Sequence, residues 1–267
     1  MQPSGLSACS RERLANARFP CEWSALLVGQ SAPTSGYAAE ATNELNAGIA
    51  MCFAQINREG GSAGRSLAPR TLDDGYDPKR TVSNTLTLLD DPAVLALTAY
   101  RGTPNIEAAF SSIEQGGIAL IGPQSGASSI YDRSQKLVFP SRASHRAEVE
   151  KIVNHGVTVG MQRVALLFTD SAFGTDVLDA ARTSLADHRM EAVKEASYPR
   201  HADDVAPAVA TIAAARPHMV LIAAAAGPAA SFIKAARQQI PGCEFYALSS
   251  VSQASFAEAI ASARSPP

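Results

Sequence analysis

No stretch of the sequence is apolar for long enough to cross a membrane. The longest apolar runs, such as residues 219–226, fall well short of the roughly 18 to 20 residues that a spanning helix needs. Neither charge is in marked excess, because 23 Lys and Arg residues face 25 Asp and Glu residues, giving a formal net charge of −2. No overall basic field would draw the chain to DNA, RNA or anionic lipid. We therefore expect neither a membrane span nor a nucleic-acid partner.

Cysteine is scarce and unpatterned. Cys9, Cys21, Cys52 and Cys243 form no CxxC pair and have no histidine at metal-ligand spacing, which argues against a zinc site or a redox dithiol. The sequence also lacks a GxSxG elbow, an HExxH motif, a Walker A motif and a GxGxxG motif, and its five histidines are scattered. We expect no metal, no cofactor and no catalytic residues, and hence a protein that is not an enzyme.

Two motifs carry most of the information that is present. INREGGSAGR at residues 56–65 and LDDGYDP at residues 72–78 mark a passage from helix to strand to helix. The Gly60-Gly61 pair supplies the positive-φ backbone that ends a helix. Residues 66–72 are typical of a short strand. Asp77 is placed to cap the helix that Pro78 begins, since proline tolerates the first helical turn.

Short β-rich runs alternate with helical patterns from residue 25 onward, which predicts α/β architecture with mostly parallel, doubly wound sheets. The expected strands are residues 25–31, 66–72, 94–99, 119–121, 137–139, 163–169, 191–198, 219–224 and 244–247. Helices are expected at residues 176–186, 206–215 and 228–239, among others. The simplest division is an unassigned segment (1–22), an N-terminal α/β lobe (23–143) and a C-terminal α/β lobe (144–267).

Acidic residues at strand ends raise a second interpretation, a phosphoacceptor receiver domain. Asp73 and Asp74 follow one expected strand, and Asp170 ends another. A receiver would hold all three in one compact domain, whereas the two-lobe division places Asp170 in the other lobe. We therefore set this interpretation aside.

Taken together, the two motifs resemble the amino-terminal signature of the leucine/isoleucine/valine-binding family of periplasmic solute receptors, which feed ABC importers. Further matches follow in order at QSAPTSG (30–36), YRGTP (100–104), SRAS (141–144), DSAFG (170–174) and HADDVAPAV (201–209). The resemblance implies a type I periplasmic-binding fold. In that family the chain returns to the first lobe after the point where this sequence ends. We therefore expect the fold to be incomplete at its C-terminal end and apolar surface to be exposed on the first lobe's sheet.

The resemblance also implies a periplasmic location, although residues 1–22 offer neither the basic region nor the apolar region of a signal peptide. Leu6-Ser7-Ala8-Cys9 matches a lipoprotein cleavage pattern without an apolar segment before it. We expect an incomplete or misplaced amino terminus. Some members of the family carry a disulfide between the loops that Tyr76 and Gly102 occupy here, and both positions lack cysteine.

Ligands of open α/β sheets bind beyond the carboxyl ends of the strands, near helix N-termini. Gly102 and Thr103 follow one such strand, and the resemblance places Thr103 where the family holds a ligand carboxylate; a plain helix cap is the alternative. Gln124, Ser125 and Gly126 follow the next strand and offer a second hydroxyl or a structural turn.

At the lobe crossover, Ser144 is expected to face the cleft. For Arg142 beside it we favour a salt bridge with a neighbouring carboxylate over an anion contact. His145, the next residue after the SRAS motif, either lines the cleft or lies at the surface.

From the second lobe we expect Phe173, Ala225 and Ser249 at the cleft. The family often presents two tyrosines and an acidic residue there, and the acidic residue pairs with the ligand ammonium. A buried ammonium without a carboxylate is costly, so either another acid such as Glu40 substitutes or the ligand is a carboxylate or amide with an apolar or aromatic body. Such a body would pack against Phe173 and Tyr37.

The resulting functional expectation is a substrate-binding protein of an ABC importer that binds an amino acid, a related small carboxylate or an amide by hinge closure. Its partners would be that small molecule and the importer's permease. Two alternatives stay open, a ligand-sensing module of a regulator or receptor and a truncated remnant that binds nothing.

Overall fold

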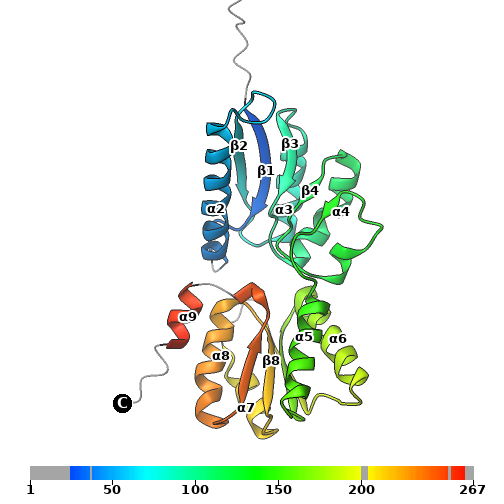
Figure 1. The fold of residues 1–267 in the computed structure, drawn as a ribbon, viewed down its shortest axis with the longest axis vertical. Helices are drawn as coiled ribbons and strands as arrows, with labels where there is room; N and C mark the ends of the chain where they lie inside the picture. The colour runs from blue at the N-terminus through cyan, green and yellow to red at the C-terminus, as the bar shows by residue number, and fades with distance from the viewer. Residues whose placement is uncertain (1–24, 37, 200–203, 252–253, 262–267) are drawn as a thin grey trace, which may run out of the picture.

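The computed structural model describes residues 25–36, 38–199, 204–251 and 254–261. The expected N-terminal segment, Tyr37 and the first residues of the HADDVAPAV motif lie outside this part of the chain. Two parallel β-sheets, each accompanied by helices, follow one another along the longest axis of the molecule (Figure 1). All the strands expected from the sequence are present, and the expected α/β class is confirmed. In the described part of the chain no helix is both long and apolar enough to span a bilayer.

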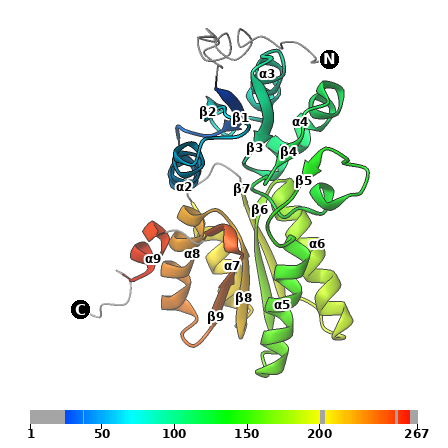
Figure 2. The ribbon, with the colours of Figure 1, turned by 45° about the horizontal axis from the view of Figure 1, so that its top comes forward.

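The first sheet has five parallel strands in the order β2-β1-β3-β4-β5. These strands are β1 (Leu26–Ala32), β2 (Leu67–Asp73), β3 (Val94–Thr98), β4 (Leu120–Ile121) and β5 (Val138–Phe139). The helical segments are α2 (Ala39–Arg58), α3 (Pro78–Leu89), α4 (Thr103–Gly116) and the short 3-10 turn η2 (Ser128–Tyr131). Figure 2 shows α2 beside β2 and the loops of this lobe reaching toward the second lobe.

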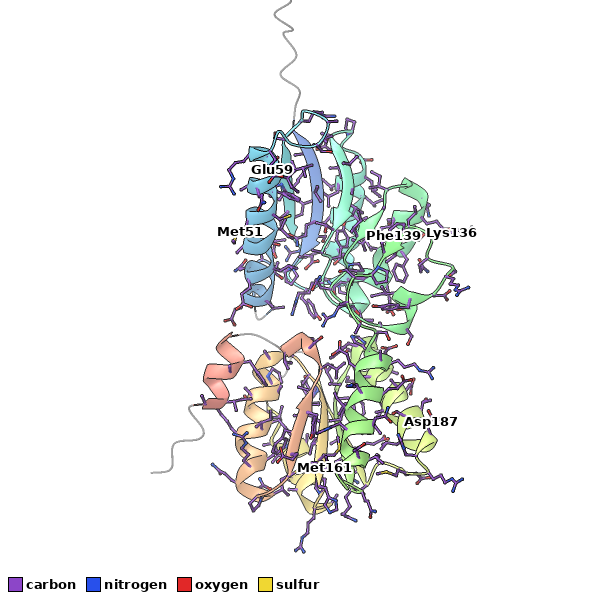
Figure 3. The ribbon with its side chains drawn as sticks, in the orientation of Figure 1. Met51, Glu59, Lys136, Phe139, Met161 and Asp187 are labelled. Carbon is purple, nitrogen blue, oxygen red and sulfur yellow. The ribbon has the colours of Figure 1, made fainter. Side chains whose placement is uncertain are left out.

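The first sheet is well covered on one face only. Leu97, Leu120 and Val138 lie side by side on neighbouring strands and pack with apolar residues of α3 and α4. The next residue along each of β4 and β5 points to the opposite face, because side chains alternate along a strand. There Ile121 is 50% exposed and Phe139, labelled in Figure 3, is 52% exposed. The expected exposure of apolar surface on this sheet is confirmed.

The second sheet has four parallel strands in the order β7-β6-β8-β9. They are β6 (Val164–Asp170), β7 (Lys194–Pro199), β8 (Met219–Ala223) and β9 (Glu244–Ala247). The helical segments are α5 (His145–Thr158), α6 (Ala172–Asp187), α7 (Ala206–Ala214), α8 (Ala226–Gln239), the 3-10 turn η3 (Ser249–Val251) and α9 (Ala254–Ala261). The predicted lobe boundary at 143/144 falls between β5 and α5.

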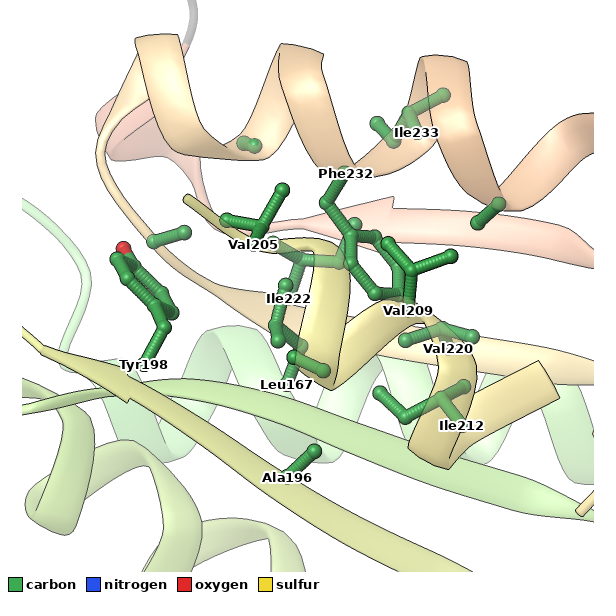
Figure 4. Close-up of a cluster of buried hydrophobic side chains, with 14 of the residues drawn as sticks. Leu167, Ala196, Tyr198, Val205, Val209, Ile212, Val220, Ile222, Phe232 and Ile233 are labelled. Carbon is green, nitrogen blue, oxygen red and sulfur yellow. The ribbon is translucent and has the colours of Figure 1, made fainter. Parts of the chain in front are cut away.

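Helices cover both faces of the second sheet. Leu167 and Ile222 point toward α7 and α8, where Phe232 fills the centre of one core (Figure 4). Leu166 and Leu221 point the other way and pack with α5 and α6. Nearly continuous apolar strands are the expected consequence of burial on both faces.

The motifs recognised in the sequence form the turns expected of them. The Gly61 N–H donates to the Ile56 carbonyl over 2.9 Å with a φ of 72°, closing the end of α2. Asp77 accepts a hydrogen bond from the Lys79 N–H over 2.8 Å and so caps α3, which begins at Pro78. The helix end and the helix start predicted from INREGGSAGR and LDDGYDP are confirmed.

Candidate functional site

A cavity of about 360 Å³ lies between the lobes, where the carboxyl ends of both sheets and the first turns of several helices meet. The first lobe contributes four of the predicted site residues to its lining, and the second lobe contributes two. These six are Gly102, Thr103, Gln124, Ser125, Phe173 and Ala225. A volume of this size accommodates a small organic molecule.

Two buried hydroxyls form one wall of the cavity. The Thr103 and Ser125 oxygens are 2.8 Å apart, and both residues are almost wholly buried. The Ser125 hydroxyl also accepts a hydrogen bond from the Ala127 N–H over 3.2 Å. Thr103 does not cap α4, because Gly102 occupies the cap position and no side chain bonds there. The helix-cap alternative for Thr103 is therefore wrong.

Two helices from opposite lobes begin at the cavity. Thr103 and Pro104 open α4, while Ala226 and Gly227 open α8, and all four residues line the hollow. In the described part of the chain neither helix has a side-chain cap or an acidic residue in its first turn. The first N–H groups of a helix have no partner within it, and the helix dipole is positive at this end. Both helix starts therefore favour a negatively charged or strongly polar acceptor.

Two tyrosines that the sequence analysis did not identify also line the cavity, one from each lobe. Tyr198, near the end of β7, is buried, and burial raises the pKa of its phenol to about 12 although hydrogen bonds with Thr169 and the Ala225 backbone oppose the shift. Tyr76 lies against Gly102, and both residues line the cavity. The signal for Tyr198 was its place at the carboxyl end of a parallel strand.

His145 connects the first lobe's cavity-lining loop at residues 124–126 to the second lobe. Its Nε2 accepts a hydrogen bond from the Gly126 N–H over 3.1 Å, so Nδ1 carries the proton and donates to Asp176 over 2.8 Å. The imidazole lines the cavity and meets the Phe173 ring edge-on. Burial would raise the pKa of Asp176, but hydrogen bonds from His145 and from the Ser128 N–H outweigh it and lower that pKa.

The expected salt bridge of Arg142 is present. Its Nη2 lies 3.8 Å from the Glu148 carboxylate and donates a hydrogen bond to the Ser249 hydroxyl. The Ser249 N–H and hydroxyl both donate to Glu148, over 2.7 and 2.8 Å. Arg142 lines the cavity as well, whereas Ser249 is held on the Glu148 side and its neighbour Ser250 lines the cavity instead.

Gly126 and Ser144, like Ser249, do not line the cavity. The Gly126 carbonyl accepts from the His145 N–H over 2.7 Å, and its Cα faces the Ala143–His145 backbone so closely that a Cβ would lie 2.6 Å from the Ala143 oxygen. The Ser144 hydroxyl caps α5 by accepting from the Ala147 N–H over 3.2 Å. Both residues position the crossover rather than contact the hollow.

Cationic side chains outnumber carboxylates in the cavity lining that the structure describes. Arg101 and Arg142 supply two guanidinium groups, and Glu40, exposed in the first turn of α2, is the carboxylate among the lining residues that the structure describes. Across the same part of the chain, no group of three His, Cys, Asp or Glu side chains is placed to hold a metal ion. The site is equipped to bind an acceptor group by hydrogen bonds and charge.

Comparison with known proteins agrees with this geometry. The model of the family described as periplasmic binding protein matches residues 26–263. A substrate-binding periplasmic protein from Ralstonia solanacearum has the same fold, with a TM-score of 0.83 and 31% identity over 89% of this chain and 68% of that one. A possible leucine/isoleucine/valine-binding protein from Rhodopirellula baltica gives a TM-score of 0.81 and 25% identity over 90% of this chain and 65% of that one.

A Pseudomonas aeruginosa protein, the leucine-, isoleucine-, valine-, threonine- and alanine-binding protein, is 29% identical over 112 residues, which are 42% of this chain and 30% of that protein. The chain thus spans about two thirds of the length of the two solved structures and aligns with under a third of the Pseudomonas protein. The resemblance seen in the sequence motifs and the expected type I fold are both confirmed. This chain belongs to the periplasmic binding protein family.

Proposed function

We propose that this protein is a substrate-binding protein of an ABC importer and that it captures a small carboxylate in the cavity between its lobes. The observation that carries the proposal is the lining itself, in which two uncapped helix starts from opposite lobes and the hydroxyls of Thr103 and Ser125 surround one hollow. Membership of the family supports a periplasmic location and a permease as the partner.

The polar groups favour a carboxylate over a zwitterionic amino acid. Anions are stabilised at helix N-termini, and a hydroxyl that already contacts a second hydroxyl can donate one hydrogen bond to a carboxylate oxygen. A ligand ammonium would need a carboxylate partner, and among the described lining residues only the exposed Glu40 offers one. The binding experiment below therefore also includes amides and amino acids as competing ligand classes. Amino acids are the ligands in the name of the Pseudomonas relative.

Rings and methyl groups complete the site. Phe173, Tyr76 and Tyr198 present aromatic surface, and Ala225 and Ala230 present small apolar surface. A ligand body of aliphatic or aromatic carbon would bury apolar area against them. Because these contacts come from both lobes, such a ligand favours the closed arrangement, and its differential affinity drives hinge closure without covalent chemistry.

The double variant Thr103→Ala with Ser125→Ala tests the proposal by isothermal titration calorimetry with aliphatic and aromatic acids, their amides and branched amino acids. We expect carboxylate affinity to fall by at least about tenfold, since each lost hydrogen bond to a charged group is worth roughly 1.5–3 kcal/mol. Thr87→Ala, which removes an exposed helix hydroxyl, is the matched control and should leave affinity unchanged.

Equal affinity of the double variant and the unaltered protein would overturn the assignment of these hydroxyls. Failure of the unaltered protein to bind any member of the panel would overturn the transport function. A thermal melt run in parallel separates loss of binding from loss of folding, because ligand at about 100 times its dissociation constant adds roughly 2.7 kcal/mol of stability.

A further inference from the structure

Two buried polar atoms on the cavity wall lack a hydrogen-bond partner. They are the Arg142 Nε and the Ser250 Oγ, each fully shielded from solvent and unpaired among the residues that the structure describes. Buried polar groups are satisfied in the great majority of cases, and an unsatisfied one costs about 1–3 kcal/mol. Both residues line the cavity, so an acceptor that reaches this wall would supply the missing partners.

The Nη2 group of Arg142 already has partners. It bonds with Ser249 and pairs with Glu148, and these contacts hold the guanidinium in place. The Nε edge is thus a fixed donor and the guanidinium a fixed positive charge. A guanidinium edge matches the planar geometry of a carboxylate better than that of other acceptors.

The unpaired atoms lie in a different part of the site from Thr103 and Ser125. Arg142 and Ser250 line both the main cavity and a second hollow of about 410 Å³ that shares Ala41, Arg101 and Gln124 with it. Thr103 and Ser125 line the main cavity alone. A single ligand extending from the hydroxyl pair toward the junction of the two hollows would reach both sets of groups.

We propose that Arg142 and Ser250 form a second carboxylate subsite and that the ligand is a small dicarboxylate. This inference rests on the proposed function, because it assigns one carboxylate to Thr103, Ser125 and the start of α4. The other carboxylate accepts from the Arg142 Nε and the Ser250 hydroxyl. The Arg101 and Arg142 guanidinium groups line both hollows, whereas Glu40 lines the main cavity and Glu44 the second hollow, so positive charge is concentrated where the two hollows join.

The test compares acids of equal carbon number by isothermal titration calorimetry. Glutarate, adipate and phthalate are titrated against pentanoate, hexanoate and 2-methylbenzoate. We expect the dicarboxylates to bind at least about tenfold more tightly than their monocarboxylate counterparts, the effect of one additional charge-assisted contact.

Matched variants locate the difference. Ser250→Ala should lower dicarboxylate affinity by about tenfold and leave monocarboxylate affinity unchanged. Thr87→Ala, which removes an exposed helix hydroxyl outside the lining of both hollows, is the control and should leave both affinities unchanged. The role of Arg142 is tested by comparing the double variant Arg142→Gln with Glu148→Gln against Glu148→Gln alone. Glu148 is replaced in both because removing Arg142 by itself would leave the Glu148 carboxylate without its cationic partner.

The outcomes separate this inference from the proposed function. Equal or tighter binding of the monocarboxylates, still abolished by Thr103→Ala with Ser125→Ala, would overturn the second subsite and leave the carboxylate receptor standing. Equal loss of mono- and dicarboxylate binding in Ser250→Ala would also overturn the subsite. No binding of any acid would overturn the proposed function and this inference with it.

Discussion

Tyr76 and Gly102 show how one pair of residues shapes the cavity. Gly102 has a φ of 92°, and a Cβ built there would lie 2.6 Å from the Tyr76 ring. The Tyr76 ring thus rests on the Gly102 backbone, and both residues line the cavity.

Gly102→Ala should destabilise the protein by about 1 kcal/mol or more and weaken ligand binding, because the new methyl strains the backbone and displaces Tyr76. Urea unfolding and calorimetry measure the two effects. Adding Tyr76→Ala should recover the part of the lost stability that comes from the clash between the new methyl and the Tyr76 ring. Gly48→Ala in α2, where a Cβ meets nothing within 4 Å, should be neutral or stabilising. A Gly102→Ala variant as stable as the unaltered protein would contradict the tight contact.

Chain position was enough to predict that two residues lie at the cavity, while their role in binding stays a prediction. Thr103 and Ser125 follow parallel strands, and the structure places both at the cavity. The prediction that Ser249 lines the cavity missed by one residue. The 3-10 turn at residues 249–251 directs the Ser249 hydroxyl to Glu148 and leaves Ser250 on the cavity wall. The sequence analysis missed Tyr76 and Tyr198 as lining residues. Tyr198 could have been found from its place at the carboxyl end of a parallel strand, whereas Tyr76 lies in a turn that carries no such signal.

At the scale of elements, the LDDGYDP motif organises the carboxyl ends of β1 and β2. Asp73 accepts from the backbone N–H groups of Thr34, Ser35 and Gly75 and from the Ser35 hydroxyl, and thereby holds the loop that leads to α2. Buried Asp74 accepts from Ser31, Thr81 and the Tyr76 N–H. Consecutive carboxylates thus fix two cavity-forming loops. The sequence analysis predicted the turn but not the contacts with Ser31, Thr34 and Ser35, because these link residues 38 to 43 positions apart.

Asp73→Asn should destabilise the first lobe by about 1 kcal/mol at pH 7, a value discounted for the partial solvent exposure of the site. Although desolvation raises the pKa of Asp73, its hydrogen bonds with Ser35, Thr34 and Gly75 lower it overall. A carboxyl with a depressed folded-state pKa stabilises the fold above its unfolded value of 3.8 and loses that contribution as the pH falls toward the folded-state value.

The stability difference between Asp73→Asn and the unaltered protein should therefore narrow as the pH falls from 5 toward 3. Urea unfolding at several pH values measures it. Asp77→Asn is the matched control, since asparagine caps a helix about as well as aspartate. A difference that stays constant across this pH range would show that the Asp73 charge contributes nothing to stability.

At the scale of the whole molecule, the lobes meet through directed polar contacts. The Asp176 carboxylate of α6 accepts from the Ser128 N–H of the first lobe and from His145 at the crossover, and His145 in turn bonds to Gly126. These bonds connect the loop that carries Ser125 to the helix whose first turn carries Phe173. A continuous series of hydrogen bonds therefore joins the two lobes beside the cavity.

The two sheets differ in how fully the chain covers them, and this difference has a measurable consequence. Replacing Ile121 with Thr and Phe139 with Ser should reduce binding of the dye ANS and slow aggregation, because both side chains are about half exposed on the uncovered face. The free energy of unfolding should change by less than about 1 kcal/mol.

Leu120→Thr, one residue away on the covered face, is the control and should destabilise the protein by about 2 kcal/mol or more, since Leu120 is fully buried beneath α3 and α4. If the surface pair proved as costly as Leu120→Thr, that face would have to be packed against protein in solution. In that case the apolar row on β4 and β5 would be an interface rather than free surface.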